Sequence, residues 1–226
     1  MPWPDSSVVD VLAEECDHVS RVVLTLSPDA FETPTRCEAW NVKELLGHMY
    51  RDVDRLIEYR GEPAPAEPDA DAVSYWRRYD PVDDSPGIAH RAIEIAKGFE
   101  TGADLARAFE VRWREAVNVA KQLEPDRIYR TFAPAMRLDE YVKTRVLEIV
   151  VHGLDLARAI GRPPWISPRA ADVTRHVLLE LLGAEPPRSL GWDEVTFIET
   201  ATGRRPLSPP EQEVLGERTE RFPLLT

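Results

Sequence analysis

The segment from Tyr141 to Gly161, YVKTRVLEIVVHGLDLARAIG, constrains the fold of this chain more than any other stretch. Its apolar residues recur with the period of a helix. Gly161, followed by Pro163 and Pro164, marks the expected end, because glycine accepts a left-handed cap and proline cannot continue the hydrogen-bond ladder. We therefore predict one helix over 141–161.

On a helical wheel, a narrow polar stripe made by Arg145, Glu148, His152 and Asp155 runs between two apolar flanks. Such a helix should bury the stripe, and a buried carboxylate or imidazole must be paired or must bind a metal. Glu148 and His152, four residues apart, can point at one ion. Alternatively, Glu148 pairs with Arg145 and His152 is satisfied inside the core. The helix alone does not decide between these readings, because a metal site needs a third ligand.

A second helix carries another inward-facing histidine. Asn41 is a good N-cap, and Glu44 three residues later completes a capping box, which predicts a helix over 42–59. His48 shares the apolar side of this helix with Asp52. Asp52 could hydrogen-bond to a core histidine, or equally could fix the tautomer of a metal-bound His48.

The remaining segments predict a mostly α-helical chain. We expect a helical bundle over 1–185 and a short strand and helix appendage, packed on it, over 186–226. Alternation in DEVTFIETATGR predicts the strand. The further helices are expected at 6–26, at 86–123 with a kink near Gly98 or Gly102, and at 167–182, with irregular segments at 61–84 and 124–137.

The segment 61–84 is rich in proline and acidic residues, and long loops of this kind often border sites. Its acidic side chains are expected to be solvated. Its three aromatic residues are harder to place in solvent, and we expect one or more of them to line a pocket mouth: Tyr75, Trp76 and Tyr79.

The other histidines and the two cysteines give weaker signals. His18, His90 and His176 each stand alone on a helix, which is typical of structural or exposed histidines. Cys16 and Cys37 form neither a disulfide framework nor a C-x-x-C motif. We interpret both as buried small hydrophobes rather than nucleophiles, in a reducing compartment.

Charge and hydropathy exclude several partners. The formal net charge is −12, whereas nucleic acid or an anionic membrane would require a basic patch. No stretch approaches the roughly 20 apolar residues of a membrane span. The first residues, MPWPDSS, have neither a basic run nor an apolar core typical of a signal peptide. We expect a cytoplasmic protein, either a monomer or a homodimer.

Three stretches resemble a known family. They are TRCEAWNVKELLGHM at 35–49, LEIVVHGLDLARAIG at 147–161, and FIETATGR at 197–204 with a closing FPLL. Together they resemble the DinB-like superfamily and, within it, the actinobacterial mycothiol-dependent maleylpyruvate isomerase family. The resemblance implies an up-down four-helix bundle, here with a small C-terminal α/β appendage. It also implies a divalent metal, usually zinc, held by His48, Glu148 and His152.

The resemblance further implies the chemistry of such a site. Three protein ligands leave open positions on zinc, as in catalytic sites. A thiol bound to zinc is deprotonated, so mycothiol would act as a nucleophile toward a small electrophile, giving isomerisation or S-transfer. Asp155 and Asp52 are expected to support the ligands, and Arg145 to neutralise Glu148 or to anchor a carboxylate. The acidic segment 61–84 and the short appendage depart from the isomerase pattern, and no counterpart of its substrate-binding arginine is evident.

Two other functions remain open at this point. Zinc-activated water could hydrolyse an amide or ester without any thiol. A metal-binding scaffold or stress protein without catalysis would use the acidic, aromatic segment 61–84 to contact a partner.

Overall fold

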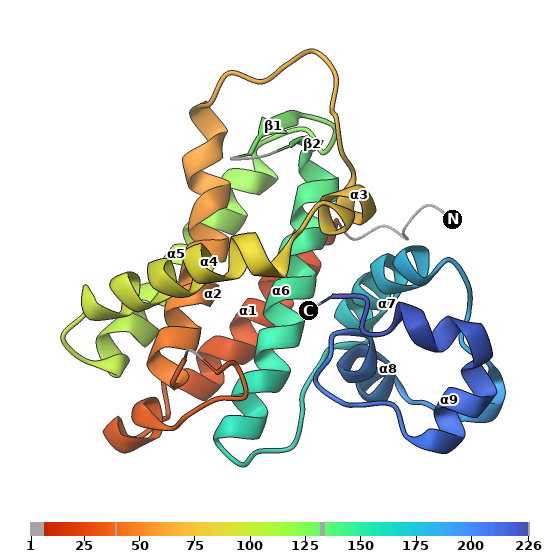
Figure 1. The fold of residues 1–226 in the computed structure, drawn as a ribbon. Coiled ribbons are helices and arrows are strands. Elements are labelled where there is room, and N and C mark those ends of the chain that lie inside the picture. Colours follow the sequence, from red (N-terminus) through yellow and green to blue (C-terminus); the bar gives the residue numbers. More distant parts are fainter. Residues whose placement is uncertain (1–6, 39, 132–133, 226) are drawn as a thin grey trace.

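The computed structural model describes residues 7–38, 40–131 and 134–225. Four long helices form its central bundle: α1 (Val8–Val23), α2 (Val42–Glu58), α5 (Gly102–Lys121) and α6 (Leu138–Ala159) (Figure 1). α1 and α2 each pack against both α5 and α6, so the four helices enclose one core. The mostly helical bundle predicted from the sequence is confirmed.

Helix α6 is the most buried element of the bundle. Apolar residues face its neighbours on several sides. In the polar stripe between them Arg145, His152 and Asp155 are buried, with Arg145 1% and Asp155 0% exposed, and Glu148 is half-buried. The helix ends where the sequence predicted, because Gly161 takes a left-handed φ of 66°. The capping box predicted for α2 is also present: Asn41 accepts a hydrogen bond from the Glu44 backbone N–H at 2.9 Å.

Two further helices cover one side of the bundle. α4 (Pro81–Lys97) crosses α2, and the short α3 (Ala72–Arg77) packs against α6 and α7 (Pro168–Leu182) (Figure 1). The segment 61–84 is therefore only partly irregular, which corrects the prediction. Asp71 begins α3 with a capping box to Ser74, but a helix of only six residues is too short to show a helical apolar period in the sequence.

The predicted helix over 86–123 is two helices rather than one kinked helix. α4 ends at Lys97, and α5 starts after Thr101, whose side chain accepts from the backbone N–H of Asp104. The connection at 124–137 contains two short antiparallel strands, β1 (Ile128–Arg130) and β2 (Ala135–Arg137), with Tyr129 opposite Met136. Strands of three residues are too short to give a clear alternating pattern.

The C-terminal part contains helices where a strand was predicted. α8 (Glu194–Ala201) packs on α7, which in turn packs on α6, and α9 (Pro209–Leu215) follows. The alternation in 193–204 is misleading because Asp193 caps a helix and the Thr200 and Thr202 hydroxyls bond back to carbonyls four residues earlier. The division of the chain at residue 185 stays a prediction. Short 3-10 turns complete the fold at Pro28–Glu32, Tyr59–Gly61, Arg188–Leu190 and Gly216–Arg221.

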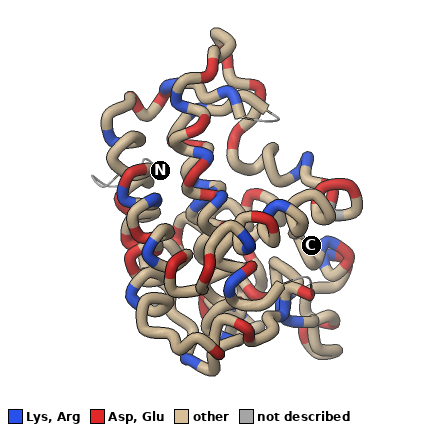
Figure 2. The backbone as a smooth tube through the Cα atoms, turned by 90° about the vertical axis from the view of Figure 1, so that its left-hand side faces the viewer, with Lys and Arg blue, Asp and Glu red and all other residues tan. Residues whose placement is uncertain are grey.

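The described surface mixes both charges. Basic residues lie among acidic ones along the backbone trace in Figure 2, and many pair within a helix, as Arg114 does with Glu110 at 2.8 Å. None of the described helices combines the length and the apolar character needed to cross a bilayer.

Candidate metal centre

Two neighbouring helices bring three ligand side chains together. α6 presents Glu148 and His152 one turn apart, and α2 presents His48 opposite them. The Oε2 atom of Glu148 lies 3.3 Å from Nε2 of His48 and 3.2 Å from Nε2 of His152. Two tetrahedral ligand atoms on one zinc ion lie about 3.3 Å apart. The residue types and their separations therefore fit a divalent ion such as zinc.

The electrostatics of this cluster favour positive charge. Burial by itself would raise the pKa of Glu148, but hydrogen bonds to His152 and His48 hold it well below its usual value. Burial would lower the pKa of His152, but hydrogen bonds to Asp155, Cys37 and Glu148 raise it well above its usual value. A divalent ion would supply the positive charge that the Glu148 and Asp155 carboxylates favour. It would compete with protons for the ligand atoms.

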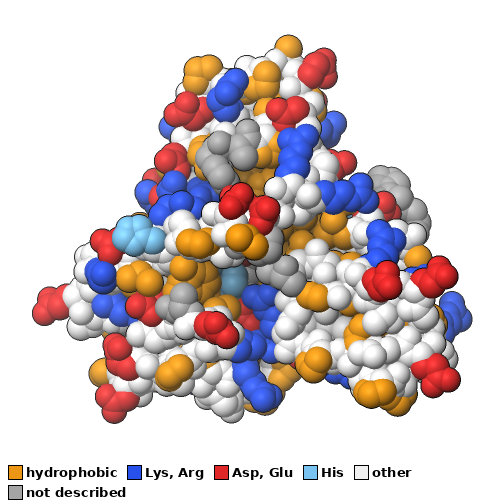
Figure 3. All heavy atoms as spheres, in the orientation of Figure 1, with side chains coloured by type: hydrophobic (Ala, Val, Ile, Leu, Met, Phe, Trp, Pro, Cys, Tyr) orange, Lys and Arg blue, Asp and Glu red, His pale blue; other side chains and the backbone are white. Residues whose placement is uncertain are grey.

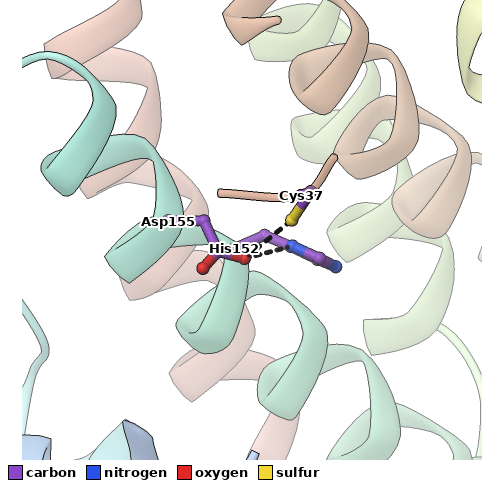
Figure 4. A group of neighbouring side chains, drawn as sticks. All are labelled: Cys37, His152 and Asp155. Atoms are coloured by element: carbon purple, nitrogen blue, oxygen red, sulfur yellow. Dashed lines mark hydrogen bonds and ion pairs between the residues drawn. The ribbon is translucent and has the colours of Figure 1, made fainter. Parts of the chain in front are cut away.

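The second ring nitrogen of His152 is held by a carboxylate. Nδ1 of His152 lies 2.9 Å from Oδ2 of Asp155, and Sγ of Cys37 lies 3.3 Å from the same oxygen (Figure 4). A carboxylate at Nδ1 fixes the tautomer that leaves Nε2 free to bind a metal. This geometry supports the role predicted for Asp155.

Asp155 is itself bound by two arginines. Arg204 donates to it at 3.0 and 3.2 Å, and Arg36 donates from the segment before α2. Burial would raise the pKa of Asp155, but the bond to His152 and the charge of Arg204 lower it. Cys37, His152 and Asp155 also form a set of closely spaced potential ligands. The Arg36 and Arg204 guanidiniums beside Asp155 disfavour a second cation at this set of ligands. We therefore interpret the set as an arrangement that orients the His152 ring.

Arg145 pairs with a different acid from the one predicted. It is buried and forms its ion pair with Asp52, with Tyr75 accepting a further hydrogen bond at 3.3 Å. The expected ion pair with Glu148 is thus replaced by one across to α2, a partner that a wheel of α6 cannot reveal. Oδ2 of Asp52 lies 3.2 Å from Nε2 of His48. Asp52 therefore lies beside Nε2 of His48, the nitrogen that faces Glu148. Fixing the tautomer of a metal-bound His48 would instead require a carboxylate at its Nδ1.

The cluster opens into a cavity of about 740 Å³ between α2, α4 and α6. Figure 3 shows a hollow near the middle of one face, with a histidine inside it and basic side chains beside it. Trp40 stacks on His48 with ring centroids 4.9 Å apart. The sequence predicted that one or more of three aromatic residues line a pocket mouth, and the cavity wall includes all three of them: Tyr75, Trp76 and Tyr79.

The remaining histidines and cysteines behave differently from one another. Among the residues that the structure describes, His18, His90 and His176 belong to no cluster of potential metal ligands. Cys16 lies in the core, as predicted, and burial raises the pKa of its thiol. Cys37 packs against the core but is only half-buried, because it also lines the cavity and contacts Asp155; the predicted full burial is wrong for it.

Sequence reasoning missed Arg36 and Arg204. They come from segments before α2 and after α8, and they meet only at Asp155. Both lie within stretches that carry the family resemblance, but nothing in the type or spacing of either residue indicates its partner.

The fold and the site define the class of this protein. It is a helical bundle with a candidate metal centre between two helices, formed by a His/Glu/His set at the base of a cavity. Within that class, the chain belongs to the mycothiol maleylpyruvate isomerase N-terminal domain family, whose sequence profile matches residues 12–157. The match extends from α1 to near the end of α6 and includes His48, Glu148 and His152. Comparisons with curated proteins and with solved structures gave no match.

Proposed function

We propose that this protein is a metal-dependent enzyme that activates a low-molecular-weight thiol, mycothiol, toward a small electrophile, for isomerisation or S-transfer. The observation that carries the proposal is the convergence of His48, Glu148 and His152 at the base of an open cavity, in a chain of this family. When bound there, a divalent ion such as zinc stabilises the thiolate form of a thiol at neutral pH.

The chain's own residues have separate roles in this proposal. His48, Glu148 and His152 would hold the ion, and Asp155 holds the His152 ring by accepting from Nδ1. Aromatic side chains near the ligands, among them Trp40 on His48, reduce access of water and offer flat surfaces to a substrate. The cavity is large enough for a small electrophile beside a thiol.

Elemental analysis of protein purified without a metal-chelating tag tests the site. We expect about one equivalent of a divalent ion, lost in His48→Ala and in His152→Ala. His176→Ala is the matched control, because His176 is exposed on α7 and outside the cluster. Unchanged metal content in His152→Ala would refute the three-residue site.

A cobalt-substituted sample tests the thiol. Adding mycothiol should change the visible absorption spectrum of bound cobalt, and thiol-dependent turnover of an electrophile should follow. Turnover without thiol would instead support a hydrolase that activates water. Bound metal without a spectral response or turnover would leave a non-catalytic metal-binding scaffold.

A further inference from the structure

The proline and the glycine inside α4 divide this helix into two parts that are held differently. Beyond Gly87, the helix is fixed to α2 and to the segment before α2. The indole N–H of Trp40 donates to the carbonyl of Ala89 at 3.5 Å. A Cβ atom on Gly47 would lie only 2.7 Å from the carbonyl oxygen of Ala92, so the two helices meet backbone to backbone there. This part of α4 is therefore a fixed wall of the cavity.

The part of α4 before Pro86 lacks such anchors. Val82 is 80% exposed, and Asp83 and Asp84 are exposed as well. Within the described residues, neither of these two carboxylates forms an ion pair. In Figure 1 this start of α4 lies in front of α6, and both elements line the cavity. A segment that borders a cavity with few buried contacts is one that opens at low cost in free energy.

The segment from Tyr79 to Ser85 forms a small unit with hydrogen bonds of its own. Asp80 accepts the backbone N–H of Val82 at 2.9 Å, and Asp84 accepts the backbone N–H of Asp80 at 3.0 Å. The hydroxyls of Tyr79 and Ser85 share a hydrogen bond of 2.7 Å. These bonds hold the unit together without tying it to the bundle, so it can move as one body.

Pro86 and Gly87 join this unit to the fixed part of α4. Pro86 has no N–H, so the carbonyl of Val82 loses the hydrogen bond that a regular helix would give it. Gly87 is a weak helix former. Packing does not require glycine here, because a Cβ atom would meet only the end of the Arg91 side chain, at 3.3 Å. The pair therefore makes α4 easiest to bend at this point.

We propose that residues 79–85 are a lid, which opens and closes the cavity by bending at Pro86 and Gly87. The lid carries part of the cavity wall, namely Tyr79, Asp83, Asp84 and Ser85. An open lid admits small molecules to the candidate metal centre, and a closed lid retains them and reduces the access of water. The lid depends on the packing of α4 and not on the chemistry proposed above.

Hydrogen exchange followed by NMR tests the hinge. In a helix, the N–H groups of residues 87–89 donate to carbonyls of the lid, so opening of the lid exposes them. We expect them to exchange at least about tenfold faster than the N–H groups of residues 93–96. The hinge variant Pro86→Ala/Gly87→Ala introduces good helix formers at exposed positions and should slow this exchange about tenfold. Glu94→Ala, an exposed change on the fixed part of α4, is the matched control and should leave it unaltered.

The two native cysteines report whether the lid controls access to the cavity. Cys37 lines the cavity, whereas Cys16 is 0% exposed and serves as an internal control. Mass spectrometry should show that a bulky maleimide labels Cys37 about tenfold more slowly in the hinge variant than in the unaltered protein. An unchanged labelling rate, or exchange beside the hinge as slow as at residues 93–96, would overturn the proposal. Slower labelling that persists when Glu148→Gln removes a candidate metal ligand shows that the lid exists even if the metal or thiol chemistry fails.

Discussion

At the scale of single residues, the site depends on ion pairs buried beside it. Arg145 and Asp52 are 1% and 3% exposed, and each is the other's charged partner across the α2–α6 interface. A buried pair adds little net stability compared with apolar residues, because both charges lose their hydration. Removing one partner is costly, since the other charge then remains buried and uncompensated.

We expect Arg145→Met to lower the free energy of unfolding by about 3–5 kcal/mol, because it leaves Asp52 without its cation. The double variant Arg145→Met/Asp52→Leu should recover most of that loss. Urea unfolding of both single variants and the double variant gives the coupling energy. Arg107→Met, which breaks only an exposed pair, should change stability by less than about 1 kcal/mol. A double variant no more stable than Arg145→Met would show that Arg145 contributes through packing against Tyr141 instead.

At this scale, the sequence predicted which residues gather but not all of their partners. Helical spacing placed Glu148, His152 and Asp155 on one stripe, because neighbours on a helix follow from the period alone. Contacts between helices depend on how the helices cross. The pairing of Arg145 with Asp52 rather than Glu148 is such a contact, and no property of α6 could reveal it.

At the scale of elements, the crossing of α2 and α4 sets the width of the cavity. Gly47 allows this crossing, because any side chain there would meet the backbone of α4. Its neighbours on α4 are the small residues Ala92 and Ala96, which are 1% and 2% exposed.

Gly47→Ala should therefore force α4 away from α2. We expect a loss of about 1–3 kcal/mol in unfolding free energy, the range typical of overpacking, measured by chemical denaturation. Gly61→Ala is the control, since nothing lies within 4 Å of a Cβ at that position and the expected change is within about 0.5 kcal/mol. A stable Gly47→Ala variant would mean that α4 can shift without cost, and the cavity wall that α4 provides would then have no fixed distance from α2.

Long helices with clear caps can be predicted from the sequence, whereas short elements cannot. α2 and α7 match their predicted ranges closely, because Asn41 and Ser167 cap them and their apolar period is clear. The sequence of α8 predicts a strand, because its eight residues include threonine and other branched side chains that alternate by chance. Its helical state depends on Asp193 and on burial of Phe197 and Ile198 against the rest of the fold.

At the scale of the whole molecule, one charged network joins the C-terminal part to the bundle. Asp155 on α6 binds Arg204, which follows α8, and Arg36, which precedes α2. Arg36 also binds Glu199 on α8 at 2.8 Å. These contacts link residues far apart in sequence, so no local pattern could predict them. Glu199 and Arg204, two members of the network that supports His152, lie outside the region that the family profile matches.

This network makes the C-terminal part and the candidate metal centre depend on each other. Replacing Arg204 with Met should lower the free energy of unfolding by about 1–3 kcal/mol, because Asp155 keeps Arg36 and His152 but loses two charge-assisted hydrogen bonds. Hydrogen exchange should show α6 and α8 losing protection together. The control Arg188→Met changes an exposed arginine of the same region and should leave both helices protected. Loss of protection confined to α8 would instead mean that residues 186–226 unfold as a separate unit, with His152 held by the bundle alone.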